Sequence, residues 1–114
     1  MRKVAILLLV SFVFPVSTLV AQVFGSIKFE NRSVGEGVEI RVRCGEKAEK
    51  GERSLKTDRF GSYSEYLPSG KCTFEVNLKG EWSMPYDIYA DQNDPVRYDF
   101  ELVRIDGQLK LERR

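Results

Sequence analysis

The chain has 114 residues, with 18 lysines and arginines against 17 aspartates and glutamates, and it has no histidine. A surface for nucleic acid or for an anionic membrane needs a clustered basic excess, which this balance does not provide. Without histidine, the usual Ser-His and Cys-His nucleophiles are excluded, together with the commonest general base at neutral pH. Lysine or paired carboxylates could still act as catalytic groups, but we expect a protein that is neither an enzyme nor a nucleic-acid binder.

The first 21 residues have the layout of a secretory signal peptide. Arg2 and Lys3 form a basic start, residues 4–16 are apolar apart from one serine, and the following segment ends at Ala21. The apolar run is shorter than the about 20 residues that a membrane-spanning helix needs. We predict cleavage after Ala21 and a secreted or periplasmic protein, with residues 22–114 as one small domain. The alternative is a membrane anchor that is never removed.

Beyond this segment, apolar and polar residues alternate with a period of two, which is typical of strands with one buried face. Turn-forming residues separate these runs about every 10 residues, as in antiparallel sandwiches. The pattern predicts an all-β, antiparallel Greek-key β-sandwich of about seven strands. The predicted strands are 23–30, 38–44, 54–57, 62–67, 72–78, 86–90 and 96–102, followed by a closing hairpin through Asp106-Gly107 to 108–111. Gly25 in the first strand is expected to allow a bulge or a close backbone approach. The charged segment 45–53 is predicted to be a solvated loop.

The chain has two cysteines, Cys44 and Cys72. In an exported chain such a pair most simply forms one disulfide, worth about 3–4 kcal/mol of stability. The alternatives are a metal pair or a redox motif, but without histidine the usual four zinc ligands require carboxylates. If the cysteines face each other across an antiparallel pair, the strand register follows. That register pairs Ile40 with Val76, Arg41 with Glu75 and Val42 with Phe74.

A longer motif follows in the middle of the chain. It reads T-D-x-x-G-x-Y (Thr57, Asp58, Gly61, Tyr63), then L-P-x-G (Leu67, Pro68, Gly70), then the core positions Phe74 and Val76. From about Val23 to Leu102 the chain resembles the carboxypeptidase regulatory-like domains, which are transthyretin-like (prealbumin-like) β-sandwiches of the carbohydrate-binding-like fold.

The chain departs from this family pattern in three places. Cys72 stands where the family commonly has tyrosine, the spacing from Tyr63 to Pro68 is shorter than usual, and residues 105–114 lie outside the motif. The resemblance implies the sandwich fold and an accessory role, since these modules occur beside peptidases, on outer-membrane receptors and as free-standing exported proteins. The absence of histidine argues against the hydroxyisourate hydrolases, a branch of transthyretin-like proteins that uses histidines.

The best candidates for ligand binding are Trp82 and the neighbouring Tyr86 and Tyr89. Sugars stack their C–H faces on flat aromatic rings, and Trp82 lies in a polar connection, 80–85, where its ring could be exposed. The alternative is that Trp82 caps one end of the core. The acidic residues of the strands (Glu39, Glu75, Asp99 and Glu101) fall on predicted wet faces, where a carboxylate is most often simply solvated.

A calcium loop is a further candidate, because one segment carries several oxygen-bearing side chains. These are Asp87, Asp91, Asn93 and Asp94. Their spacing matches no known calcium loop, and such turns are common for backbone reasons. We predict a non-catalytic exported module without metal or cofactor, with a structural or protein-interaction role toward an envelope or extracellular protein. The alternative is a carbohydrate-binding module that uses the aromatic residues near Trp82.

Overall fold

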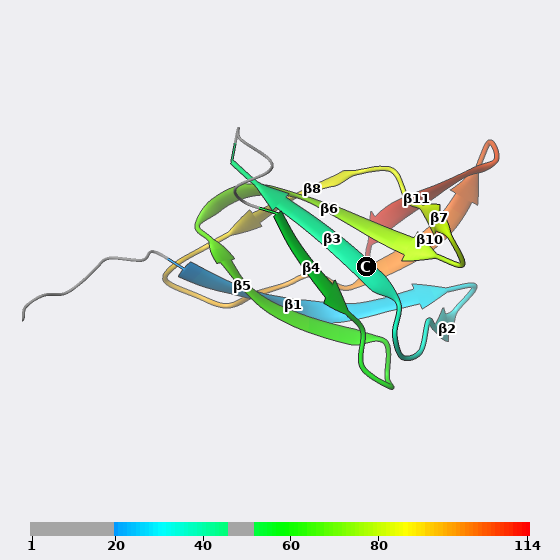
Figure 1. Ribbon diagram of the computed structural model, residues 1–114, viewed down its shortest axis with the longest axis horizontal. Helices are drawn as coiled ribbons and strands as arrows, with labels where there is room; N and C mark the ends of the chain where they lie inside the picture. Colours follow the sequence, from blue (N-terminus) through cyan, green and yellow to red (C-terminus); the bar gives the residue numbers. More distant parts are fainter. Residues whose placement is uncertain (1–19, 46–51) are drawn as a thin grey trace, which may run out of the picture.

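The structure, a computed structural model, describes residues 20–45 and 52–114, which form two β-sheets (Figure 1). Sheet I contains β1 (Val20–Phe29), β2 (Arg32–Ser33), β5 (Ser62–Pro68), β9 (Val96–Arg97), β10 (Phe100–Ile105) and β11 (Gln108–Arg113). Sheet II contains β3 (Glu39–Cys44), β4 (Glu52–Lys56), β6 (Gly70–Leu78), β7 (Glu81–Trp82) and β8 (Tyr86–Ala90). The predicted all-β sandwich is confirmed. The predicted signal peptide, as far as residue 19, and most of the predicted charged loop lie outside the described residues.

Sheet I is built around β1, which has neighbours on both sides along its length. Its first part pairs antiparallel with β5 and parallel with β9, and its last part pairs antiparallel with β2 and parallel with β10. The parallel pairings differ from the antiparallel arrangement predicted from the sequence. The end of β8 and the start of β1 lie at the same end of the sandwich. The chain crosses there from sheet II to sheet I, so β9 starts at that end and runs in the same direction as β1.

Gly25 allows a close backbone approach at the break between β9 and β10, as predicted. The amide of Tyr98 donates to the carbonyl of Phe24 at 2.8 Å, and the amide of Ser26 donates to Oδ1 of Asp99 at 2.9 Å. A Cβ at Gly25 would overlap the carbonyl oxygen of Tyr98. The predicted strand 96–102 is therefore two strands, separated by a two-residue break that only glycine in β1 can accommodate.

In sheet II, the predicted disulfide between Cys44 and Cys72 is present, and it joins direct cross-strand partners of β3 and β6. The predicted register is confirmed at all the pairs that it names: Ile40 with Val76, Arg41 with Glu75, and Val42 with Phe74. The closing hairpin also has the predicted turn, since Asp106 and Gly107 both have positive φ.

The core fills the space between the two sheets. Its buried members include the predicted inward residues Tyr63, Leu67 and Phe74. Two ion pairs join the sheets at opposite edges. Arg53 lies 3.8 Å from Glu65, and Arg104 donates to both carboxylate oxygens of Glu81. The Arg104 guanidinium lowers the pKa of the Glu81 carboxyl, and Glu81 in turn raises the pKa of Arg104.

Candidate functional site

The turn between β4 and β5 contains the first half of the sequence motif, and Asp58 organises it. Its carboxylate oxygen Oδ1 accepts from the amides of Phe60 at 2.8 Å and Ser62 at 2.9 Å. Its own amide donates to the carbonyl of Ser62, and its carbonyl accepts from the amide of Gly61. Four hydrogen bonds through one residue fix the turn, which is the usual reason for aspartate at this position.

The neighbouring motif residues tie the turn to the rest of the protein. Thr57 is buried, and its hydroxyl donates to the carbonyl of Gly35 at 2.6 Å and accepts from the amide of Val38. Gly61 has φ +75°, and a Cβ there would overlap Oγ of Ser33. That serine hydroxyl donates to the carbonyl of residue 60 at 2.8 Å. The turn is therefore fixed by hydrogen bonds within it and by hydrogen bonds to the segment 33–38.

The tyrosine of the motif belongs to the core. The hydroxyl of Tyr63 donates to the carbonyl of Tyr98 at 2.7 Å and so satisfies a buried acceptor at the break between β9 and β10. Burial, and then the nearby Asp99 carboxylate, raises the pKa of Tyr63 well above its ordinary value. Leu67 is buried as well. The motif residues thus have structural roles.

Phe60 lies at the tip of this turn and points away from the core. It is 71% exposed, the highest value among the large hydrophobic side chains of the described residues. The guanidinium of Arg59 lies beside it, 5.9 Å from the ring centroid. Phe60 was not predicted as a candidate from the sequence. The only available signal was the presence of an apolar residue, Phe60, within the D-x-x-G turn, where exposed polar residues are usual.

Trp82 is half-buried on the outer face of sheet II, opposite Asn77 of β6. The guanidinium carbon of Arg41 lies 4.0 Å from the Trp82 ring centroid. The same arginine donates from Nε to the Glu75 carboxylate at 2.9 Å. One face of the indole is thus covered by an arginine that is itself fixed by an ion pair.

The other two predicted aromatic residues lie elsewhere. Tyr86 faces inward, with its ring edge against Phe100 at a centroid distance of 5.0 Å. Tyr89 is 58% exposed and pairs with Lys71, six positions along β6 from the partner of Trp82. At about 3.4 Å per residue this separation is about 20 Å. The structure therefore does not bring the three rings together into one platform.

Glu75 differs from its predicted environment, because it is buried although it lies on the outer face of sheet II. Arg41 and Arg43 flank it on β3, with the Arg43 guanidinium 3.9 Å away. The long stems of the arginines cover the carboxylate while their charges compensate it. This carboxylate is therefore an ion-pair partner and not a solvated surface group.

Two of the four candidate calcium ligands, Asp87 and Asp91, have other partners. Asp91 accepts from the amide of Asn93, as in an Asx turn, and Asp87 lies 3.4 Å from the ammonium of Lys71. Within residues 20–45 and 52–114, no group of three or more Cys, Asp or Glu side chains is arranged to hold a metal ion. In the same ranges, no helix is long and apolar enough to cross a membrane.

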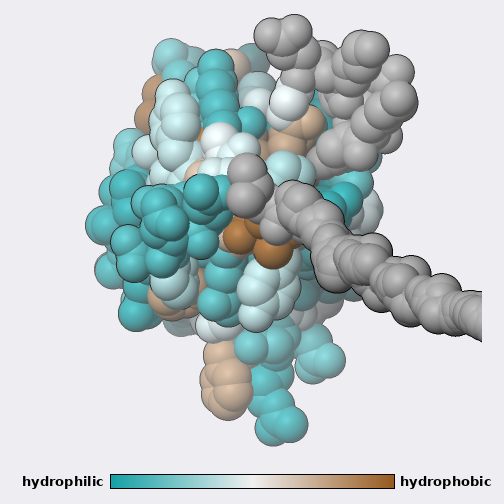
Figure 2. All heavy atoms as spheres, turned by 90° about the vertical axis from the view of Figure 1, so that its left-hand side faces the viewer, coloured by the Kyte–Doolittle hydropathy of each residue, from teal (hydrophilic) through white to brown (hydrophobic). Residues whose placement is uncertain are grey.

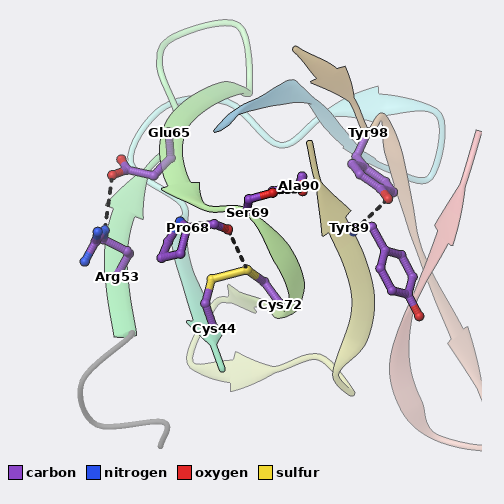
Figure 3. Close-up of a disulfide and its surroundings, with 9 residues drawn as sticks. All are labelled: Cys44, Arg53, Glu65, Pro68, Ser69, Cys72, Tyr89, Ala90 and Tyr98. Carbon is purple, nitrogen blue, oxygen red and sulfur yellow. Dashed lines mark hydrogen bonds and ion pairs between the residues drawn. A yellow bond between two sulfur atoms is a disulfide. The ribbon is translucent and has the colours of Figure 1, made fainter. Parts of the chain in front are cut away.

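The disulfide lies at one end of the sandwich, close to the corner formed by Pro68 and Ser69 (Figure 3). The Ser69 hydroxyl donates to the carbonyl of Ala90 at 3.3 Å and ties this corner to β8. The ring of Tyr89 points away from the disulfide, and its amide donates to the hydroxyl of Tyr98 (Figure 3). Both cysteines are buried, so the bridge is a structural link. Figure 2 shows this end of the molecule as mainly hydrophilic, with hydrophobic residues in small separate groups.

Neither the protein-family models nor the curated proteins include a match to this chain. Among solved structures, the chain is similar to a DUF3823 family protein from Parabacteroides merdae ATCC 43184, with a TM-score of 0.55 and 8% sequence identity. The similarity covers 82% of this chain and 46% of the other, so the chain spans about half the length of that protein. At this identity, the likeness shows a common fold alone.

Proposed function

We propose that the chain is a non-catalytic, exported β-sandwich module that binds a protein of the envelope or extracellular space through Phe60. The observation that carries this proposal is the 71% exposure of Phe60 on a turn held by hydrogen bonds. Phenylalanine and arginine are both enriched at protein interfaces, and a rigid loop loses little conformational entropy on binding. Arg59 and Phe60 together form the docking point.

The disulfide supports the exported location. Bridges of this kind persist in oxidising compartments and are rare in the cytosol. Cys44 and Cys72 join the central strands of sheet II, and both side chains are buried. The basic and apolar residues at the start of the sequence agree with this location, as does the resemblance of the Thr57–Gly70 motif to carboxypeptidase regulatory-like modules.

Photo-crosslinking in the native envelope tests the proposal. A photoreactive phenylalanine analogue is placed at position 60 and, as a matched control, at position 89, which is comparably exposed on another face. We expect one protein to be crosslinked from position 60 and not from position 89. Binding of that purified protein should then weaken at least about tenfold in Phe60→Ala, as for an interface hot spot. Equal crosslinking from both positions, or crosslinking to lipid alone, would contradict the proposal.

A further inference from the structure

The outer face of sheet I contains an open hollow of about 490 Å³ next to the β4–β5 hairpin. Outward residues of β1 and β5 form its floor, with Phe24 opposite Ser64 and Ser26 opposite Ser62. Gln22 lines the same hollow, and its side-chain amide donates to the Ser64 hydroxyl at 3.1 Å. The floor thus combines one aromatic ring with an amide and several hydroxyl groups.

A second aromatic side chain extends this surface. Tyr66 is 60% exposed and lies opposite Gln22, one outward position beyond Ser64 on β5. It is therefore a diagonal cross-strand neighbour of Phe24, at about 7–8 Å between the backbones. Two rings on one sheet face, with an amide and hydroxyls between them, present alternating apolar and hydrogen-bonding groups.

The charges around the hollow compensate one another. The Nε of Arg97 donates to Asp99 at 2.8 Å, so this cation already has an anionic partner. Its guanidinium carbon lies 5.9 Å from the Phe24 ring centroid, farther than the 4.0 Å between Arg41 and Trp82, so it does not stack closely on Phe24. At the other side of the hollow, Lys56 is accompanied by Asp58. The hollow therefore favours neither an anion nor a cation. A neutral ligand with many hydroxyl groups fits it better.

From these observations we infer that the outer face of sheet I is a binding site for a neutral oligosaccharide chain. The C–H faces of two sugar units stack on Phe24 and Tyr66, and their hydroxyls exchange hydrogen bonds with Gln22, Ser62 and Ser64. Because the hollow is open, it accepts a chain laid along the surface. The affinity of such a shallow site is expected to be weak, with Kd about 1 mM or somewhat tighter. This site is separate from the Phe60 docking point, and sugar binding here does not require that Phe60 binds a protein.

The test is an NMR titration of the isotope-labelled protein with neutral oligosaccharides of glucose, xylose, mannose and N-acetylglucosamine. We expect amide shifts along β1 and β5. Tyr66→Ala should weaken binding at least tenfold with an unchanged melting temperature, because this side chain is largely exposed. Gln22→Ala should also weaken it. Tyr89→Ala is the matched control, since Tyr89 has nearly the same exposure on the other sheet and should bind as well as the original chain.

Three results would overturn the inference. The first is the absence of shifts with all of these sugars at millimolar concentration. The second is binding of acidic or sulfated sugars only, which would contradict the balanced charges of the hollow. The third is binding that survives Tyr66→Ala and Gln22→Ala but disappears in Trp82→Ala, which would place the sugar on sheet II. Phe60→Ala should leave the sugar titration unchanged whether or not Phe60 binds a protein.

Discussion

The guanidinium of Arg41 stacks on the ring of Trp82 at 4.0 Å from its centroid, and this contact covers one face of the ring that was a candidate for stacking a sugar. Trp82→Ala should therefore act mainly on stability. Loss of the cation–π contact and of the indole packing is expected to lower the free energy of unfolding by about 1–2 kcal/mol. Urea unfolding measures this change. An unchanged unfolding midpoint together with a loss of sugar binding would contradict this mainly structural role of Trp82.

The disulfide closes a long loop between two central strands. Replacing both cysteines, as Cys44→Ala with Cys72→Ala, should lower the free energy of unfolding by about 3–4 kcal/mol under the chain-entropy account. The sequence separation of the bridge is 28 residues. Denaturant unfolding of the variant and of the oxidised protein gives the difference. A loss below about 1 kcal/mol would mean that the bridge constrains the unfolded chain very little.

The start of β1 bears on the processing site. Val20 and Ala21 pair with Pro68 and Leu67, and the Ala21 side chain is buried. A chain that begins at Gln22 loses these contacts, so we expect residues 20–114 to be more stable than residues 22–114 by about 1–2 kcal/mol. Thermal unfolding of the two chains measures the difference. Equal stability would show that Ala21 adds nothing to the fold, while intact mass of the native protein would identify its true N-terminus.

The pH dependence of stability should reveal the buried hydroxyl of Tyr63. Burial raises its pKa above the ordinary value of about 10, so the folded protein holds this proton more tightly than the unfolded chain does. The stabilisation is complete below about pH 10 and falls as the pH rises past it. Urea unfolding near pH 8 and near pH 11 should show this loss in the original chain and less of it in Tyr63→Phe. Tyr66→Phe, an exposed control, should behave like the original chain.

The features of this fold that could be predicted are those that leave a pattern or a marker residue in the sequence. The register of β3 and β6 followed from two cysteines, and the inward faces of strands followed from alternation, as Tyr63 and Leu67 show. The parallel pairing of β1 with β9 and β10 was missed, because hydrogen bonding between distant segments leaves no local pattern. Gly25 signalled a close approach without naming the carbonyl that it meets.

The candidate sites were harder to predict than the fold. Trp82, Tyr86 and Tyr89 are close in sequence, but the alternation of strand faces and the length of β6 separate them. Tyr66 and Phe24 are far apart in sequence and become neighbours only through the pairing of β1 with β5. The exposure of Phe60 depends on the direction in which its turn points, which single-sequence patterns do not contain.

The most direct test of the account compares two neighbouring residues of one turn, Asp58 and Phe60. Asp58→Ala removes the two side-chain hydrogen bonds of the four that fix the turn, and it should lower the free energy of unfolding by about 1–2 kcal/mol. Phe60→Ala should leave that free energy within about 0.5 kcal/mol, because the side chain is exposed. The decisive measurement is the affinity of Phe60→Ala for the protein crosslinked from position 60. We predict a loss of at least about tenfold with unchanged stability. Unchanged affinity would contradict the assignment of Phe60 as the docking residue.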